Sequence, residues 1–117
     1  MSEQALHRAV AEFLNWTLKP PFFFTTFPSG GGGKVRGAQL KAMGLKAGVP
    51  DIYIAGPRGK TLWIELKTAK GRLSPAQNHT IEQLAQLDHD WALCRSVQDV
   101  QRAVAEWCGY VERKSAA

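Results

Sequence analysis

Asp51, Glu65 and Lys67 have the residue types and the spacing that metal-dependent hydrolysis needs. They lie in two short runs, residues 51–55 and 61–67, in which apolar and polar side chains alternate. The sequence between the runs is rich in glycine and proline, which is typical of a turn. The pattern predicts a β-hairpin that carries two acids and a lysine.

The predicted hairpin sorts its side chains onto two faces, because neighbouring residues of a strand point in opposite directions. The core face would be built by Ile52, Ile54, Leu62, Ile64 and Leu66. A turn centred on Arg58 pairs residues whose numbers sum to about 116, so that Asp51 faces Glu65. Tyr53 then faces Trp63. Facing carboxylates repel, and a hard divalent cation is the simplest group that reverses this effect, so a metal site is predicted.

A third acid, Glu3, opens a predicted amphipathic helix over residues 3–18, which Pro20-Pro21 ends. At about 100° per residue, Glu3 falls within the apolar arc and Glu12 falls on the opposite side. Glu3 would then face the hairpin. An acid in the first turn also favours the positive end of its own helix, so the residues leave both roles open.

Gln77 and Lys67 each have a structural and a chemical interpretation. Ser74-Pro75-Ala76-Gln77 predicts the start of a helix that runs to about Leu87, with Gln77 completing a capping box. Gln77 also lies on the helix face that points towards the sheet. Lys67 projects from the same strand face as Glu65, where it would polarise a water and offset phosphate charge, or form an ordinary salt bridge.

The other patterns complete a single α/β domain over residues 1–117. Residues 22–27 predict an edge strand because Pro21 precedes them, and residues 91–94 predict another strand. Ser96 begins a final helix, and a frayed tail is expected over about residues 112–117. The order αβββαβα predicts a small mixed sheet flanked by helices.

A basic, glycine-rich loop is expected over about residues 28–48, which contain no acid. Within it, residues 36–45 have enough helix formers for a short helix. The formal net charge of +5 suits a polyanionic partner. Candidate contacts to a DNA backbone are Lys34, Arg36, Lys41, Lys46 and Arg72.

Other classes of function find little support in the sequence. No apolar run approaches the roughly 20 residues that cross a bilayer, and the N-terminus lacks a signal-peptide pattern, so a cytoplasmic protein with no membrane contact is expected. Neither the two cysteines nor the three histidines, His7, His79 and His89, have metal-ligand spacing, and surface histidines are favoured. Tyr53 and Trp63 would stack on a base, pack under the first helix or lie at a dimer contact.

Three segments together resemble one nuclease family. They are Leu40–Asp51, which ends in Pro50-Asp51; Trp63–Thr68, which contains Glu65-Leu66-Lys67; and Gly71–Gln77. They resemble the VRR-NUC (virus-type replication-repair nuclease) family of the PD-(D/E)XK superfamily, particularly its compact stand-alone members in phages and prophages. The resemblance extends from Glu3 to about Val100, and the superfamily's restriction-endonuclease-like αβββαβ core matches the predicted order.

The resemblance implies an endonuclease that hydrolyses DNA with Mg²⁺ or Mn²⁺. By it, Asp51 and Glu65 are metal ligands, the carbonyl of Leu66 adds a ligand, and Glu3 matches the acid of the first helix. Lys67 would be the catalytic lysine and Gln77 would support the site. The resemblance also implies a homodimer that acts on branched DNA such as Holliday junctions, in a bacterial or phage-infected cell. The alternative is an inactive DNA-binding subunit that keeps the fold.

Overall fold

The computed structural model describes the backbone of residues 1–27 and 33–116, and the side chains of these residues as far as Val111. The helices are α1 (Glu3–Thr17), α2 (Gly33–Ala42), α3 (Pro75–Gln86) and α4 (Val97–Ala116). The strands are β1 (Phe23–Thr26), β2 (Ile52–Ala55), β3 (Thr61–Leu66) and β4 (Asp90–Cys94), with a 3₁₀ turn, η1 (Pro57–Gly59), between β2 and β3. The α/β fold is as predicted. The order is αβαββαβα, which differs from the predicted αβββαβα by helix α2 between β1 and β2.

A four-stranded mixed sheet forms the centre of the fold in the order β1-β2-β3-β4. The first three strands are antiparallel, and β4 runs parallel to β3 after the crossover through α3. The expected hairpin register is confirmed, since Tyr53 lies opposite Trp63 and Ile52 lies opposite Ile64. The edge position predicted for β1 is also confirmed.

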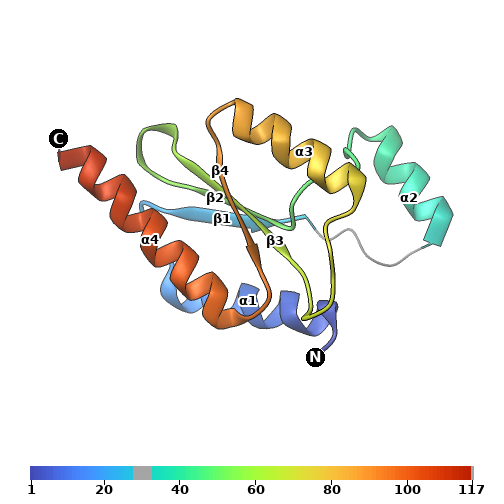
Figure 1. Cartoon of the computed structure of the whole chain (residues 1–117), viewed down its shortest axis with the longest axis horizontal. Coiled ribbons are helices and arrows are strands. Elements are labelled where there is room, and N and C mark those ends of the chain that lie inside the picture. Colours follow the sequence, from blue (N-terminus) through green and yellow to red (C-terminus); the bar gives the residue numbers. More distant parts are fainter. Residues whose placement is uncertain (28–32, 117) are drawn as a thin grey trace.

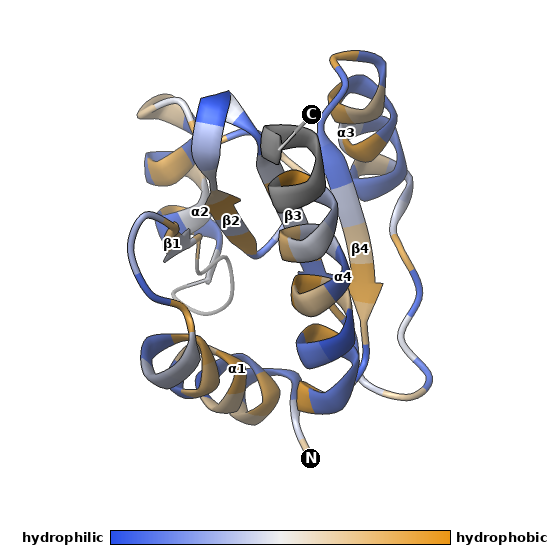
Figure 2. Ribbon diagram, turned by 90° about the vertical axis from the view of Figure 1, so that its left-hand side faces the viewer, coloured by the Kyte–Doolittle hydropathy of each residue, from blue (hydrophilic) through white to orange (hydrophobic). Residues whose placement is uncertain are grey.

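Helices α1 and α4 cover one face of the sheet, and α3 lies on the other face (Figure 1). Leu6, Val10 and Leu14 of α1 and Val100, Trp107 and Val111 of α4 form one core with the inward residues of β2 and β3. The expected core face of the hairpin is therefore confirmed. Figure 2 shows how hydrophobic and hydrophilic residues alternate along α1 and α4, as the helical period requires. No helix within the described part of the chain is long and apolar enough to cross a bilayer.

The predicted helix starts are confirmed in detail. Ser74 Oγ accepts a hydrogen bond from Gln77 N, and Gln77 Oε1 accepts one from Ser74 N, at 3.1 and 2.8 Å. At the start of α4, Ser96 Oγ accepts from Asp99 N at 3.0 Å. Because these bonds satisfy amide groups that the helix itself leaves unpaired, they determine where each helix begins.

Two predicted boundaries need correction. The short helix expected over residues 36–45 of the basic loop is present as α2, but it covers residues 33–42. Its alanine, leucine, glutamine and basic residues favour a helix although little apolar surface is available to bury. The backbone of residues 112–116 continues α4 where a frayed tail was expected, since Trp107 and Val111 extend the buried stripe to that end of the helix. Residues 28–32 of the expected loop lie outside the described residues.

Gly48 is the point at which the chain entering β2 meets the start of α3. It has a φ of +79°, and a Cβ there would lie 2.3 Å from the carbonyl oxygen of Ala76 and 2.7 Å from the amide nitrogen of Gln77. Thr80 Oγ1 donates to Ala47 O at 3.0 Å beside this contact. The close approach therefore places Asp51 and Gln77 on either side of one packed junction, which only glycine allows.

We predict that Gly48→Ala destabilises the protein by at least about 2 kcal/mol, because both the φ value and the space around Gly48 exclude a methyl group. Gly37→Ala is the matched control, since Gly37 lies within α2 and a Cβ there would meet nothing within 4 Å. It should leave the stability unchanged or raise it by up to about 1 kcal/mol. Urea unfolding measures both changes, and equal effects of the two substitutions would contradict the packed junction.

Candidate active site

Asp51 comes one residue before β2 and reaches across to the end of β3. Its carbonyl oxygen accepts a hydrogen bond from Phe27 N at 2.8 Å, which continues the β1–β2 pairing to this residue. Its carboxylate oxygen Oδ2 accepts a hydrogen bond from the Leu66 amide at 2.7 Å. Asp51 therefore lies beside residues 65–66, as predicted. Its contact with Leu66 is made by the amide nitrogen, whereas the carbonyl of Leu66 was the atom expected to bind the metal.

Glu65 is a carboxyl group buried on the face of the sheet that lies opposite the hydrophobic core. Its side chain is only 2% exposed. Oε2 accepts a hydrogen bond from Gln77 Nε2 at 3.2 Å, whereas the buried Oε1 accepts no hydrogen bond from the described residues. Burial, then repulsion from Asp51 and a hydrogen bond that the protonated Glu65 carboxyl makes with Asp51, raise the pKa of Glu65 from 4.5 to about 8, and the nearby Lys67 ammonium acts in the opposite direction.

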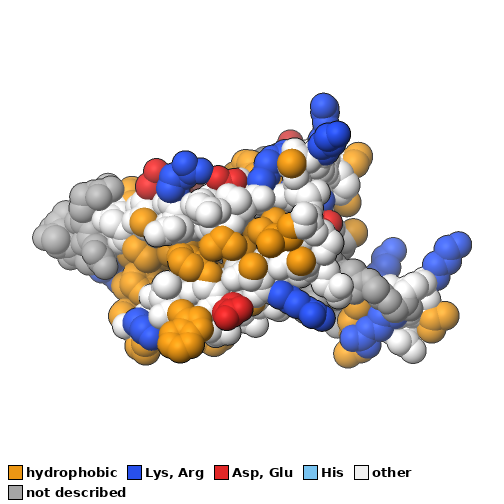
Figure 3. Space-filling view, turned by 90° about the horizontal axis from the view of Figure 1, so that it is seen from below, with side chains coloured by type: hydrophobic (Ala, Val, Ile, Leu, Met, Phe, Trp, Pro, Cys, Tyr) orange, Lys and Arg blue, Asp and Glu red, His pale blue; other side chains and the backbone are white. Residues whose placement is uncertain are grey.

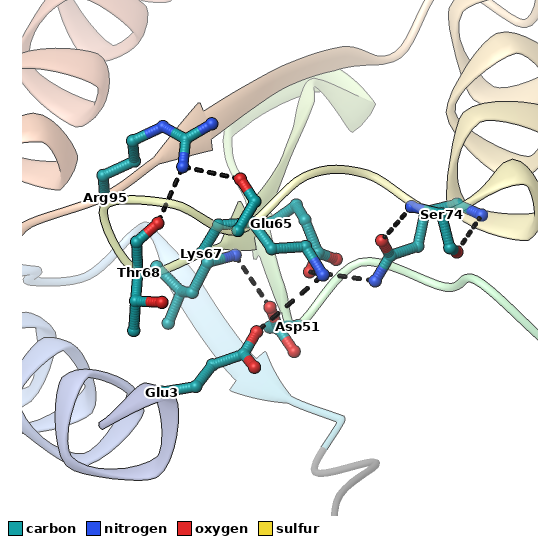
Figure 4. A network of polar contacts seen from close by, with 10 residues as sticks. Glu3, Asp51, Glu65, Lys67, Thr68, Ser74 and Arg95 are labelled. Carbon is teal, nitrogen blue, oxygen red and sulfur yellow. Dashed lines mark hydrogen bonds and ion pairs between the residues drawn. The ribbon is translucent and has the colours of Figure 1, made fainter.

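Lys67 lies between two acids at the end of β3. Its Nζ is 3.7 Å from Glu65 Oε2 and 3.9 Å from Glu3 Oε1, and its side chain is 14% exposed (Figure 4). The ion-pair interpretation of Lys67 is thus correct in this state of the protein. The ion pairs do not conflict with a catalytic role for Lys67. An ammonium beside two carboxylates could also offset the charge of a phosphate bound near these acids.

Glu3 joins the site from the first turn of α1. Ser2 caps this helix by accepting a hydrogen bond from Ala5 N at 3.0 Å, so Glu3 is its first residue. The Glu3 side chain is 57% exposed and points towards Lys67 (Figure 4). Both roles considered for Glu3 are therefore compatible with its place. The competing acid, Glu12, is exposed further along α1, near the other end of the helix.

Gln77 serves the helix and the site at the same time. Its Oε1 completes the capping box with Ser74, and its Nε2 donates to Glu65 Oε2. The structure thus brings together five of the predicted site residues from four elements or their ends, namely Glu3, Asp51, Glu65, Lys67 and Gln77.

The predicted DNA-contacting residues all lie on exposed surface. Lys34, Arg36 and Lys41 are exposed on α2, and Lys and Arg side chains project from the end of the molecule that carries this helix (Figure 3). Lys41 and Lys46 line a cavity of about 260 Å³ that extends to Ser74 and Gln77. Arg72 is exposed in the loop before α3. Gln77, at one side of this cavity, is also the residue that donates a hydrogen bond to Glu65.

An aromatic row lies beside the acids on the same sheet face. The rings of Tyr53 and Trp63 are 4.9 Å apart, and Phe27 stacks on Trp63 at 5.9 Å. Because α1 packs on the opposite face, the interpretation that this pair lies under the first helix is wrong. His89 also differs from a simple surface histidine. It is half-buried, and its Nδ1 accepts a hydrogen bond from Trp63 Nε1 at 3.2 Å and contacts the Thr61 hydroxyl.

Two further residues contribute to the site and were not predicted from the sequence. Ser2 caps the helix that carries Glu3. It could have been predicted because serine is a preferred N-cap residue and it directly precedes an amphipathic helical pattern. Arg95 binds the loop that follows Lys67. Its only signal is that it comes directly after β4, whose carboxyl end lies beside that of β3 because the two strands are parallel.

Two carboxylates of the cluster have the chemistry to bind a divalent cation. Within the described side chains, no three acids, histidines or cysteines lie close enough together to form a ready-made metal group. Glu65 nevertheless offers a buried oxygen without a partner, and Asp51 supplies a second carboxylate that raises the pKa of Glu65. Carboxylate oxygens are the ligands that Mg²⁺ and Mn²⁺ prefer, so Asp51 and Glu65 fit such an ion as the inner pair.

We predict that the metal-free protein loses stability as the pH rises from about 5 to about 8. Because the pKa of Glu65 is raised on folding from 4.5 to about 8, the folded state keeps a proton that the unfolded state releases in this range. The contribution of Glu65 is complete below pH 4.5 and is lost as the pH rises through the folded pKa. The slope from this group is at most about 1.4 kcal/mol per pH unit.

Urea unfolding in EDTA across this range measures the slope for the wild type, for Glu65→Gln and for the exposed-acid control Glu12→Gln. The slope should be shallower in Glu65→Gln and unchanged in Glu12→Gln. A Glu65→Gln protein with the wild-type slope would contradict the raised pKa.

Comparisons with known proteins agree with this fold. The family model described as the VRR-NUC domain matches residues 2–98. A solved structure described as a VRR_NUC domain protein is similar with a TM-score of 0.69 and 25% identity, over 91% of this chain and 87% of that chain. A second, described as a VRR_NUC domain, has the same fold with a TM-score of 0.60 and 15% identity, over 88% of this chain and 94% of that chain.

A search of curated proteins found no match in sequence. The family model covers most of the chain, including the acidic cluster and Lys67, and the resemblance expected from the sequence is confirmed. The chain therefore belongs to the VRR-NUC domain family, a family of nucleases.

Proposed function

We propose that this protein is a divalent-metal-dependent DNA endonuclease whose cation is held by Asp51 and Glu65. The observation that carries the proposal is the buried oxygen of Glu65, which accepts no hydrogen bond from the described residues and lies near a second carboxylate. A buried acceptor left unpaired costs free energy, and native proteins rarely keep one unless something else binds it. A hard cation would satisfy this oxygen and remove the repulsion between the two acids.

Mg²⁺ or Mn²⁺ bound there would supply a Lewis acid for the scissile phosphate and a water of lowered pKa. Asp51 is oriented for binding by the Leu66 amide, and Glu65 is oriented by Gln77 Nε2. Both hydrogen bonds leave one oxygen of each carboxylate for another partner. The carbonyl of Leu66 is the proposed further ligand.

Lys67 is the proposed catalytic lysine, because its ammonium lies within 4 Å of carboxylate oxygens of both Glu65 and Glu3. Its ammonium would orient the attacking water and balance the charge that develops on the phosphate. Glu3 contacts this ammonium from α1, so it contributes either as an outer metal ligand or by holding Lys67 in place. Gln77 supports Glu65 and is not expected to contact the phosphate.

The DNA backbone is proposed to lie along the basic surface formed by Lys34, Arg36, Lys41, Lys46 and Arg72. The cavity lined by Lys41 and Lys46 reaches Gln77, which donates a hydrogen bond to Glu65, and this supports the proposed placement of the DNA. Contacts of this kind position DNA without reading its sequence.

Selectivity for branched DNA such as Holliday junctions and action as a homodimer are the finer parts of the proposal. A four-way junction presents two symmetry-related strands, and a two-fold dimer of this chain would present two acidic clusters to match them. The resemblance to compact stand-alone members of the family supports this step, and a substrate panel tests it.

We predict metal-dependent DNA cleavage that is lost in Asp51→Asn and in Glu65→Gln. Each substitution removes a charge that the cation needs and keeps the size of the side chain, so cleavage should fall by at least about 100-fold. The assay compares four-way junction, nicked, splayed and linear DNA with Mg²⁺, Mn²⁺ or EDTA. Glu12→Gln is the matched control and should cleave as the wild type does, whereas Glu3→Gln reports whether the acid of α1 takes part.

Equal cleavage of linear and branched DNA would contradict the proposed selectivity for branched DNA. It would not contradict the proposed nuclease activity. If the wild type binds these DNAs with no cleavage in either metal, the alternative of an inactive DNA-binding subunit replaces the proposal. Sedimentation with and without a junction tests the homodimer directly.

We also predict that the basic surface controls affinity for DNA independently of the metal. Changing Lys34, Arg36, Lys41 and Lys46 together to glutamine should weaken binding in EDTA and lower the slope of log K against log salt by about 0.9 for each phosphate that is no longer neutralised. Changing Arg8, Lys19, Lys60 and Arg102 to glutamine removes the same charge elsewhere and is the control. Equal weakening in the two variants would show that net charge alone, and not this surface, binds the DNA.

A further inference from the structure

The turn that follows Lys67 is held by a side chain from another strand end. Between β3 and α3, residues 68–71 form a turn in which Gly71 N donates to Thr68 O at 3.0 Å. The Arg95 guanidinium nitrogen Nη1 lies 2.7 Å from Thr68 O, 2.7 Å from Gly71 O and 3.3 Å from Ala69 O (Figure 4). One arginine nitrogen thus contacts three carbonyl oxygens of a single turn.

The 68–71 turn also lies against the side chain of Lys67. A Cβ added to Gly71 would be 3.2 Å from Lys67 Cδ and 3.3 Å from Lys67 Cβ. The backbone of Gly71 therefore covers the aliphatic part of Lys67 with little room for a larger residue. This contact restricts the path of the chain that carries Nζ towards Glu65 and Glu3.

Arg95 is itself positioned from both sides. It directly follows β4, and Lys67 N donates to Cys94 O at 3.0 Å, which joins the two strand ends. Its own amide donates to Asp99 Oδ2 at 2.9 Å, in the first turn of α4. The base of the Arg95 side chain is therefore tied to β3 and α4, and its guanidinium reaches the turn from a fixed origin.

We propose that Arg95 is a positioning residue for Lys67, acting through the 68–71 turn. The inference rests on the proposed nuclease function. The contacts given for the Arg95 side chain are to the backbone of the 68–71 turn, so Arg95 would act on Lys67 through this turn. Arginine suits this task because its guanidinium remains charged, and the two hydrogens of Nη1 can be shared among neighbouring carbonyl oxygens of one turn.

The test compares Arg95→Ala, Arg95→Lys and Arg102→Ala with the wild type in steady-state DNA cleavage. Arg102 is an exposed control at the same corner of the molecule, paired with Asp99. In Arg95→Ala, kcat should fall by about 10- to 100-fold, because a displacement of about 1 Å in a catalytic group has effects of this size. KM for DNA and the half-saturating Mg²⁺ concentration should match those of Arg102→Ala. The kcat of Arg95→Lys should lie between that of Arg95→Ala and that of the wild type.

A second readout follows the position of Lys67 without any catalysis. In metal-free protein, the rate at which an acylating reagent modifies the Lys67 amine is measured by mass spectrometry, relative to Lys19, which is exposed and lies outside the 68–71 turn. The relative rate should rise in Arg95→Ala and stay at the wild-type value in Arg102→Ala. If Arg95→Ala fails to fold, the same comparisons are made with Arg95→Lys.

The two readouts separate the inference from the function on which it rests. A kcat in the Arg95 variants equal to that of Arg102→Ala, in an enzyme that cleaves DNA, overturns the positioning role. If the wild type does not cleave DNA, the proposed function fails. The labelling then decides alone whether Arg95 holds Lys67, and an unchanged relative rate overturns it.

Discussion

The register between β2 and β3 is the constraint on which both the core and the candidate site depend. With Tyr53 opposite Trp63, the isoleucines and leucines of the two strands all face α1 and α4. The same pairing places Asp51 and Glu65 together on the other face. A slip by one residue would exchange the faces, bringing carboxylates into the core and apolar side chains out of it. The burial of apolar surface that folds the protein therefore also assembles its acids, and no separate stabilising interaction has to bring them together.

Local patterns were sufficient to predict the elements that surround the site. The hairpin, the edge strand and the caps at Ser74 and Ser96 each follow from a few neighbouring residues, because period-two alternation and capping boxes are local effects. Helix α2 gave a weak signal since its residues are exposed apart from the half-buried Leu40, and a helix without a buried face has no apolar period to detect.

The contacts that escaped prediction are those between distant parts of the chain. Arg95 meets residues 68–71 only because the crossover through α3 sets β4 parallel to β3, and His89 meets Trp63 for the same reason. The sequence contains both partners of each contact. It lacks a local sign of which strand ends become neighbours, so the pairing of strands must be known before such side-chain contacts can be inferred. Glu3 was found in sequence because its helix has a strong apolar arc that orients it.

Gln77 limits which sequences this fold can accept. A capping box works equally well with glutamate or glutamine at its third position, so helix α3 by itself would tolerate a change between them. Here the amide oxygen caps the helix while the amide nitrogen donates to Glu65, and a carboxylate has no hydrogen to donate in its place. Glutamate would set another negative charge against a buried acid. An exchange that is neutral for most helices is thus closed to this one, and the start of α3 can drift during evolution only as far as the acid beside it permits.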